Sequence, residues 1–229
     1  MTRYKVTTNG DDAPKVDSSK QKYSEMLKES PKMFENEYLD YFTRVDPLQV
    51  IVTYVPAILY LTVSGYNIAM SSLGASTSND TYKHWLGGFV VWTLSEYWLH
   101  RVVFHFDAPY EWAHKMHFMI HGVHHDHPHD KQRLLMPPMA SIPIASAFGF
   151  LFYKLFDDGL WQLFMAGWLF GYICYDLLHY HFHFNKPLTF IDQFLRQNHM
   201  RHHFVDHSNG FGVSSPLWDY VFLTLPKLK

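Results

Sequence analysis

A long stretch without charge is the feature that most limits how this chain can fold. The 33 residues from Pro47 to Asn79 contain no Asp, Glu, Lys or Arg, and the segment Val50 to Val63 is nearly all apolar. A helix needs about 20 predominantly apolar residues to cross the hydrocarbon core of a bilayer. The stretch is therefore long enough to form a membrane-spanning helix.

Three further apolar runs follow along the chain. Trp85 to Leu99 is interrupted only by Glu96, whereas Leu134 to Tyr153 and Gly159 to Tyr175 have no charge at all. We predict an all-α integral membrane protein with four transmembrane helices at about 47–70, 82–104, 134–156 and 159–180. The alternative is that the runs are buried helices of a soluble bundle. The second and fourth runs, which are the shorter ones, allow either interpretation when taken alone.

The distribution of basic residues favours the membrane interpretation. If the four runs span, 17 of the 19 Lys and Arg residues fall on one side of the bilayer, and only Lys83 and Lys154 fall on the other. Such an excess marks the cytoplasmic side. We therefore expect cytoplasmic termini and a multi-pass topology in the endoplasmic reticulum of a eukaryote or the inner membrane of a bacterium.

The remaining segments set the domain organisation. Residues 1–30 are polar and unpatterned, so we expect a mobile tail and no signal peptide, followed by one membrane domain over 31–226. Tyr110 to Ile120 and Pro187 to Leu195 mix aromatic with charged residues, which suits helices lying at the membrane interface or packed on the protein's own cap. The net charge of -2 gives no case for a nucleic-acid partner, and the single cysteine, Cys174, excludes an intrachain disulfide or a thiolate metal site.

Histidine is unusually abundant and unusually placed. The chain has 17 histidines, with none before His84 and none from Asp130 to Leu178. In the four-span topology, all except His84 lie at the cytosolic ends of the second and fourth spans or in the loops that follow them. Sixteen imidazoles at one membrane boundary indicate a shared function in a cytosolic helical cap.

The spacing of these histidines predicts metal binding. They occur as HRVVFH from His100, HGVHH from His121, HYHFH from His179 and HMRHH from His199. Residues three or four apart lie on one side of an α-helix, while adjacent residues diverge by about 100°, so adjacent histidines can face different metals. His100 and His105 are five apart, and the helix must end or bulge between them if both are to face one ion.

Ten imidazoles divide naturally over two metal ions. Five ligands each would leave a sixth octahedral position open for dioxygen or substrate, whereas a closed structural zinc site takes four ligands. The alternatives are structural zinc sites and inert surface or core histidines. The ten candidate ligands are His100, His105, His121, His124, His125, His179, His183, His199, His202 and His203; the histidines left outside the spacing are His84, His114, His117, His127, His129, His181 and His207.

Carboxylates near these ligands are candidates for orienting them. Histidine ligands commonly donate their second N–H to a carboxylate. Glu96 precedes His100 by four residues, Asp176 precedes His179 by three, and Asp107 follows His105 by two. A structural ion pair or helix cap is the alternative, above all for Asp107. Glu96 and Asp176 lie near membrane depth, where a carboxylate is costly without a partner, so their positions favour a functional role.

With these motifs the chain resembles the fatty acid hydroxylase superfamily of membrane di-metal oxygenases, most closely the fatty acid 2-hydroxylases. The resemblance runs from about Ser30 to Leu223. Besides the histidine motifs, it is carried by SPKMFENEYLDYF, WTLSEYWLHRVVFHFD, HDKQRLLMPP, GYICYDLLHYH and GFGVSSPLWDYVF. The histidine motifs are shared with sterol desaturases and carotene hydroxylases, while MPP and GFGVSS are typical of the 2-hydroxylase branch.

The resemblance implies a fold, an activity and a cofactor. It implies four membrane helices, a cytosolic cap holding two metal ions on the ten histidines, and insertion of one oxygen atom from O2 at C2 of a fatty acyl chain, free or in a ceramide-type sphingolipid. Iron is expected in the active enzyme, and zinc can replace it in purified protein. Some relatives carry a fused cytochrome b-type domain, for which residues 1–46 are too short, so a separate cytochrome b-type protein or a ferredoxin with its reductase is the expected electron donor.

The sequence also contains candidates for lipid binding and allows rival functions. Asn209, Tyr175 and Tyr180 are candidates for holding the polar head of the lipid, from their location alone. A sterol or carotenoid oxidase or a desaturase of the same superfamily is one alternative, and a membrane protein whose metals are purely structural is another. A transporter fits less well, because its ionisable groups should lie near the middle of the bilayer.

Overall fold

The computed structural model describes residues 32–73, 78–106 and 108–226. These residues form helices joined by turns and loops, and no strand occurs among them. The fold is therefore all-α, as predicted. The expected polar tail over 1–30 and the candidate carboxylate Asp107 lie outside the described residues.

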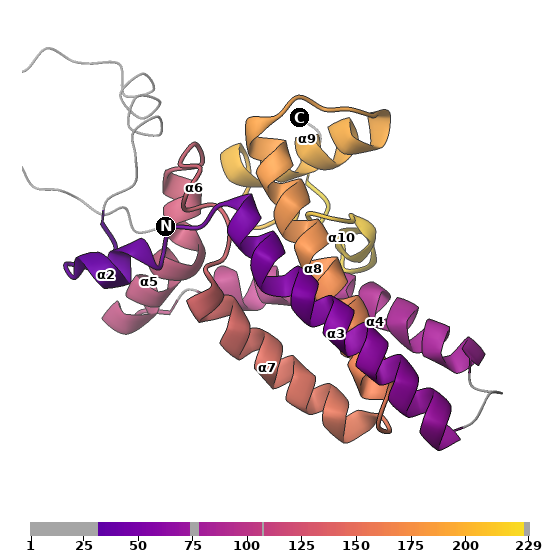
Figure 1. The fold of residues 1–229 in the computed structure, drawn as a ribbon. Coiled ribbons are helices and arrows are strands. Elements are labelled where there is room, and N and C mark those ends of the chain that lie inside the picture. Colours follow the sequence, from indigo (N-terminus) through magenta and orange to yellow (C-terminus); the bar gives the residue numbers. More distant parts are fainter. Residues whose placement is uncertain (1–31, 74–77, 107, 227–229) are drawn as a thin grey trace, which may run out of the picture.

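Four long helices form the body of the molecule (Figure 1). They are α3 (Pro47–Leu73), α4 (Ser78–Trp98), α7 (Pro138–Leu155) and α8 (Leu160–Phe184), and they occupy the four apolar runs of the sequence. Pro137 is the N-cap of α7 and Pro138 its first residue. Proline lacks a backbone N–H and is well suited to a first helical turn, so α7 begins at Pro138 and not at Leu134, where the apolar run begins.

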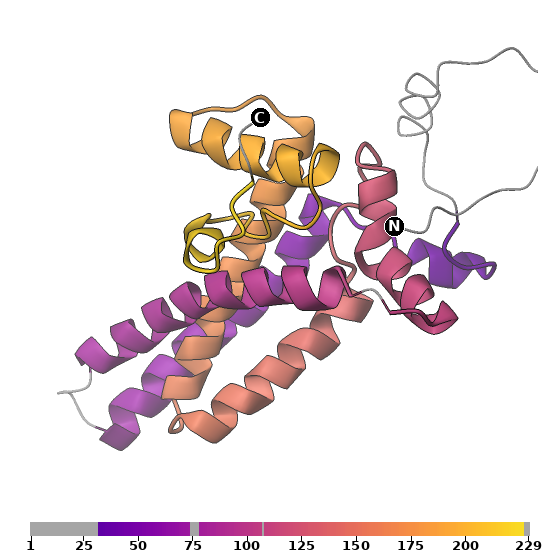
Figure 2. The same cartoon turned by 180° about the vertical axis from the view of Figure 1, so that it is seen from behind.

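Helix α8 lies at the centre of the body, packed against α3, α4 and α7 (Figure 2). Two glycines allow its close approach to α4. A Cβ atom on Gly88 would lie 1.9 Å from the carbonyl oxygen of Phe164, and one on Gly167 would lie 1.8 Å from that of Trp85. Since real side chains never approach so closely, the crossing of α4 and α8 depends on these two residues having no side chain.

Two helices among the described residues are long and apolar enough to cross a membrane, where the sequence analysis predicts four. They are Pro47–Ser72 of α3 and Pro138–Leu155 of α7, and only 22% and 17% of their apolar windows are buried. Helix α4 is not apolar enough to count as a candidate span, and it carries the charged residues Asp80, Lys83 and Glu96. Helix α8 carries Gln162 and Asp176, both of which are buried inside the protein.

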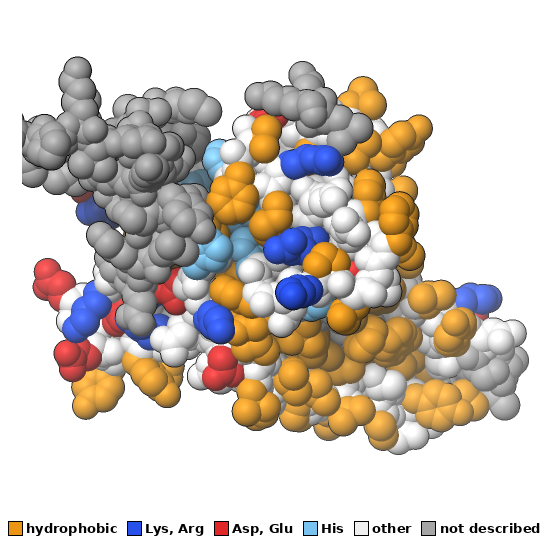
Figure 3. All heavy atoms as spheres, turned by 90° about the horizontal axis from the view of Figure 1, so that it is seen from above, with side chains coloured by type: hydrophobic (Ala, Val, Ile, Leu, Met, Phe, Trp, Pro, Cys, Tyr) orange, Lys and Arg blue, Asp and Glu red, His pale blue; other side chains and the backbone are white. Residues whose placement is uncertain are grey.

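The shorter helices gather at one end of the body and form a cap (Figures 1 and 2). They are α2 (Glu37–Tyr41), η2 (Leu99–Phe104), α5 (Glu111–His117), η3 (Phe118–Gly122), α6 (Val123–Asp126), α9 (Phe190–Phe204) and α10 (Leu217–Val221). Figure 3 looks onto this cap: histidine side chains reach its surface beside Lys and Arg, and hydrophobic side chains dominate the surface of the long helices.

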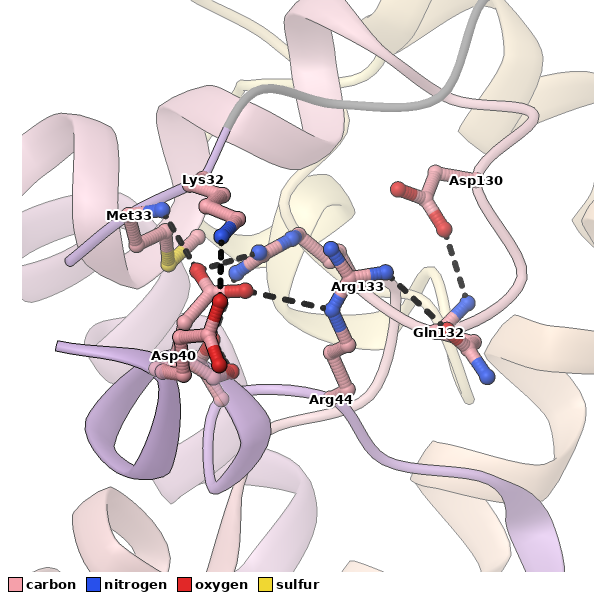
Figure 4. Close-up of polar contacts among 9 residues, drawn as sticks. Lys32, Met33, Asp40, Arg44, Asp130, Gln132 and Arg133 are labelled. Carbon is pink, nitrogen blue, oxygen red and sulfur yellow. Dashed lines mark hydrogen bonds and ion pairs between the residues drawn. The ribbon is translucent and has the colours of Figure 1, made fainter. Parts of the chain in front are cut away.

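A buried ion pair clasps the segment before α3 to the loop after α6 (Figure 4). Nη2 of Arg133 donates to Asp40 at 2.7 Å, and Nη1 donates to Oγ1 of Thr43 at 2.5 Å. Burial by itself would raise the pKa of Asp40, but the hydrogen bonds from Arg133, Met33 N–H and Arg44 outweigh it and lower that pKa to about 2. The clasp thereby anchors the loop that follows the HGVHH motif.

Candidate metal centre

The structure brings the ten predicted histidines together as two groups of five. The first histidine group consists of His100, His105, His121, His125 and His202, and the second of His124, His179, His183, His199 and His203. Within each group, one nitrogen from each ring lies within 4.8 Å of all the others. The division into five and five matches the ligand count expected from the sequence.

The rings of each group converge through their Nε2 atoms. In the first group, Nε2 of His121 lies 3.0 Å from that of His100 and 2.9 Å from that of His125, and Nε2 of His105 lies 3.0 Å from that of His202. In the second group, the corresponding distances are 2.9 Å for His124 and His203, 3.0 Å for His179 and His124, and 2.9 Å for His183 and His199.

These distances suit nitrogen ligands around a single ion. Two nitrogens at right angles on a metal with bonds of about 2.1 Å are separated by about 3.0 Å. The ring protons support the same interpretation, because Nδ1 of His100 and of His202 each face a backbone carbonyl oxygen, that of Phe211 at 2.6 Å and that of Asn209 at 2.8 Å. Both rings therefore carry their proton on Nδ1 and leave the Nε2 lone pair for a cation.

A π-helix brings His100 and His105, which are five residues apart, onto one side of the helix. Helix η2 covers Leu99–Phe104, and the N–H of His105 donates to the carbonyl oxygen of His100 at 3.2 Å. The wider turn places residues five apart on one side, so both rings join the first histidine group. The bulge predicted from the spacing is confirmed.

Adjacent histidines separate between the groups, as their divergence on a helix predicts. His124 and His125 follow each other on α6, and His202 and His203 follow each other on α9, yet each pair divides between the two groups. His179 and His183, four residues apart on α8, both belong to the second group. The first group thus draws its ligands from the cap alone, whereas the second combines two ligands from α8 with others from α6 and α9.

Burial keeps the imidazoles neutral and hence able to bind metal. Desolvation, together with the charge that a protonated neighbouring ring would carry, lowers the pKa of His105 to about 3, and desolvation followed by the effect of His129 lowers that of His183 to about 3. Desolvation likewise lowers the pKa of His202 to about 4. A histidine must be deprotonated to bind a metal, so these rings present free lone pairs at neutral pH.

The two described carboxylate candidates differ in what they contact. Glu96 is buried, and its carboxylate accepts hydrogen bonds from the backbone N–H groups of Val213 and Ser214 at 2.5 and 2.8 Å, and from no histidine. Asp176 is buried beside α8's histidines, and its Oδ2 has no hydrogen-bond partner within the described part of the chain. The four-residue spacing could not predict the backbone partners of Glu96, because the loop over 210–214 folds between that carboxylate and the histidine rings.

The three residues considered for the lipid head lie in different surroundings. The Tyr175 ring packs 5.6 Å from the His179 ring, measured between centroids, and lines a cavity beside it. The side chain of Asn209 donates to Asp206 at 2.6 Å, while its carbonyl holds His202. The Tyr180 ring packs against Phe184 at 4.7 Å.

The histidines outside the spacing stay outside both groups. Nδ1 of His84 lies 2.7 Å from the carbonyl oxygen of Asp80, near the start of α4. Nε2 of His181 pairs with Asp192 at 2.8 Å and so fixes the start of α9. His207 and His117 pack their rings near the first histidine group, with centroids 4.9 Å from His125 and 6.0 Å from His105 respectively.

An apolar cavity lies beside the metal centre. It has a volume of about 20 Å³, and its walls come from α4, η2, the loop before α7, α7 and α8: Trp92, Glu96, Leu99, Phe104, Met136, Ser141, Ile144, Ala145, Trp168, Tyr172 and Tyr175. Phe104 packs 5.5 Å from the ring of His121 in the first group, and Tyr175 packs against His179 in the second. One wall residue of the cavity therefore packs against each histidine group.

A larger open groove of about 540 Å³ runs along α3, α7 and α8. Its lining includes Tyr54 and Ala145, and Ala145 also lines the small cavity. The hydroxyl of Tyr54 forms a 2.5 Å hydrogen bond with that of Ser141, another wall residue of the small cavity. The groove and the cavity are thus neighbours across this pair. Periodicity alone gave no signal for either, because both arise where separate helices diverge.

Comparison with known proteins places this centre in a family. Residues 85–224, which contain all ten converging histidines, match the fatty acid hydroxylase family. The chain belongs to this family. A dihydroceramide fatty acyl 2-hydroxylase of Arabidopsis thaliana is 33% identical over 201 residues, which cover 88% of this chain and 82% of that protein.

A second relative and a solved structure support the same family assignment. The fatty acid 2-hydroxylase of Homo sapiens is 31% identical over 209 residues, covering 85% of this chain and 56% of the human protein. A solved structure of full-length scs7p, in which only the hydroxylase domain is visible, superposes with a TM-score of 0.76 at 34% identity, covering 86% of this chain and 73% of that one. The resemblance to this family drawn from the sequence is confirmed.

Proposed function

We propose that this protein is an O2-dependent monooxygenase that hydroxylates C2 of a fatty acyl chain, either free or within a ceramide-type lipid. The observation that carries the proposal is the convergence of ten imidazole Nε2 atoms into two five-membered sets beside an apolar cavity. The names of the relatives, which include fatty acid 2-hydroxylase and dihydroceramide fatty acyl 2-hydroxylase, support the position and the substrate class.

Each histidine group would hold one metal ion, iron in the active enzyme and zinc in some purified samples. Two bound iron ions, supplied with electrons by a separate cytochrome b-type protein or ferredoxin, would provide the O2 activation that breaking an unactivated C–H bond requires. The five rings of each group would hold its ion, with room for dioxygen or substrate as a further ligand. His105, His125 and His183 are only half-buried, so the centre is reachable from the cap surface.

The acyl chain would reach the centre from the bilayer along the groove between α3 and α7. A cavity of about 20 Å³ holds little more than one water molecule, so an entering acyl chain would have to widen it. The Tyr54–Ser141 hydrogen bond lies on this route, and breaking it would let the groove and the cavity join. The walls of Trp92, Leu99 and Phe104 would then exclude water from the reacting carbon.

We further propose that α4 and α8 cross the membrane together with α3 and α7, giving four spans. Exposed apolar side chains such as Tyr60 (70%) and Phe150 (63%) support contact of α3 and α7 with lipid. Helix α8 is largely covered by its three neighbours, so its polar residues need not meet lipid. The basic residues collected at the cap end support a cytoplasmic cap and cytoplasmic termini.

Lipid analysis of an expressing host tests the function. Total lipids from cells carrying the wild-type chain, the His202→Ala variant or no gene should be separated and fragmented by mass spectrometry. We expect 2-hydroxy acyl chains in the wild type alone. Hydroxylation elsewhere on the chain, a new double bond, or modified sterols or carotenoids would contradict the proposal and support another activity of the superfamily.

A protein with purely structural metals makes a different prediction. If the ions only held the cap together, the His202→Ala variant would lose its folded cap and not merely its activity. Thermal unfolding and limited proteolysis of detergent-purified variant protein distinguish the two, since the enzyme interpretation predicts a folded, inactive variant.

A further inference from the structure

The loop from Asn209 to Ser214 holds two rings of the first histidine group. The carbonyl oxygen of Phe211 accepts a hydrogen bond from Nδ1 of His100 at 2.6 Å, and the carbonyl oxygen of Asn209 accepts one from Nδ1 of His202 at 2.8 Å. Both acceptors belong to the backbone of one short loop. Its position therefore sets the orientation of both rings.

The same loop is held in turn by a buried carboxylate on α10. Oδ2 of Asp219 accepts the N–H of Gly212 at 2.7 Å, and Oδ1 accepts the N–H of Phe211 at 2.9 Å and the hydroxyl of Thr224 at 2.8 Å. Asp219 is only 1% exposed. With three donors aimed at it, the carboxylate is well placed to carry its charge without solvent.

One peptide unit joins Asp219 to His100. The peptide between Phe211 and Gly212 donates its N–H to Asp219 and accepts the imidazole N–H of His100 through its C=O. A carboxylate at the N–H end of a peptide polarises the group and makes its carbonyl oxygen a stronger acceptor, because hydrogen bonds in a chain reinforce one another. The effect on the ring has the same sign as that of a carboxylate bonded directly to a ligand histidine.

Glycine at position 212 makes this approach possible. A Cβ atom there would lie 2.1 Å from the carbonyl oxygen of Ser215 and 2.9 Å from Oδ2 of Asp219. Any side chain would displace either the turn or the carboxylate. On the other side of the loop, the N–H groups of Val213 and Ser214 donate to Glu96, which fixes the loop from α4.

We propose that Asp219 is a positioning residue that acts through the Phe211–Gly212 peptide on His100 and thereby tunes the metal ion of the first histidine group and not that of the second. The inference rests on the proposed function, in that two ions occupy the two groups. The loop contacts histidine nitrogens of the first group only, at His100 and His202, so the consequence is confined to one ion.

Mössbauer spectroscopy of the full chain loaded with ⁵⁷Fe(II) without oxygen tests this directly. The signal of the first ion is identified as the one lost in His105→Ala. In Asp219→Asn, which preserves size and removes the charge, we expect that signal to shift and the affinity of that ion to fall about 10- to 100-fold, with the second signal unchanged. Asp158→Asn, at the exposed turn between α7 and α8, is the charge-matched control and should change neither signal.

A milder variant guards against failure to fold. Thr224→Val removes one donor to Asp219 and should shift the same signal by a smaller amount. Unchanged spectra in variants that still bind two iron ions, or equal shifts of both signals, would overturn the inference alone. A wild-type chain that binds no iron would overturn the proposed function and the inference with it.

Discussion

His124 and His125 are neighbours in the chain, yet their rings point into different halves of the centre. Nε2 of His124 lies 2.9 Å from that of His203, whereas Nε2 of His125 lies 2.9 Å from that of His121. The rotation of about 100° per residue on a helix produces this separation. Two adjacent residues thus link the first and second histidine groups rigidly.

The divergence of this pair predicts that each ring can be removed with a separate effect. In His124→Ala the second ion should be lost and in His125→Ala the first, so iron content should fall from about two to about one per chain in both. Elemental analysis gives the stoichiometry, and Mössbauer spectra show which ion remains. His114→Ala, on the exposed side of α5, should retain both ions. Loss of both ions in either single variant would argue against two separable sites.

The sequence predicted much of this arrangement, for identifiable reasons. Helical spacing alone required adjacent histidines to diverge and required a bulge between His100 and His105. The spacing carried no information on which distant motif supplies each partner, because the meeting of His105 with His202 depends on how η2 packs on α9. That pairing is a property of the assembled cap.

Carboxylates and membrane helices were harder to predict. A short sequence separation suggested that Glu96 bonds to His100, but a loop more than a hundred residues later takes that place. Asp219 belongs to no histidine motif and reaches the His100 ring through a peptide. Hydropathy recognises α3 and α7, whose apolar surfaces are exposed, while α8 is shielded by its neighbours and is free to carry polar residues.

The π-helix makes a second prediction. Inserting one alanine after Val102, an exposed residue of η2, should place His105 six residues after His100 and rotate it by about 100° away from the first histidine group. The first ion should then bind weakly, and the second should bind normally. Val102→Ala keeps the register and serves as the control. Full binding of both ions in the insertion variant would show that the register between His100 and His105 is not needed.

The clasp between Asp40 and Arg133 should stabilise the cap. Asp40→Asn leaves the buried Arg133 without its carboxylate and should lower the free energy of unfolding by about 3–5 kcal/mol, whereas Arg133→Gln should cost less because Asp40 keeps its pair with Arg44. The pKa of Asp40 is lowered to about 2, below its value in the unfolded chain, so this stability is present above pH 4 and is lost as the pH falls from about 4 towards 2.

Denaturant unfolding of purified protein at several pH values checks this contribution. The difference between wild type and Asp40→Asn should be constant near neutral pH and should shrink as Asp40 becomes protonated in the acid range. Glu111→Gln, which breaks only an exposed pair with Lys115, should have almost no effect at any pH. Equal stability of wild type and Asp40→Asn at neutral pH would contradict the role of the clasp.

The route of the acyl chain gives a prediction on α7. Ala145 lines both the groove and the small cavity, so Ala145→Leu should fill the passage and lower kcat/KM by at least about tenfold while leaving both ions bound. Ala147→Leu, on an exposed position of the same helix outside both, is the matched control. Measurement of 2-hydroxy product from purified protein with a soluble electron donor separates the two variants. Full activity in Ala145→Leu would place the substrate elsewhere.

Oxygen labelling tests the central claim most directly. Membranes containing the wild-type chain or His202→Ala should be supplied with ¹⁸O2 and a deuterated acyl substrate, and the products analysed by fragmentation mass spectrometry. The account predicts one ¹⁸O atom at C2 of the acyl chain in the wild type and none in the variant. A product whose oxygen comes from water, or equal labelling in the two proteins, would contradict it.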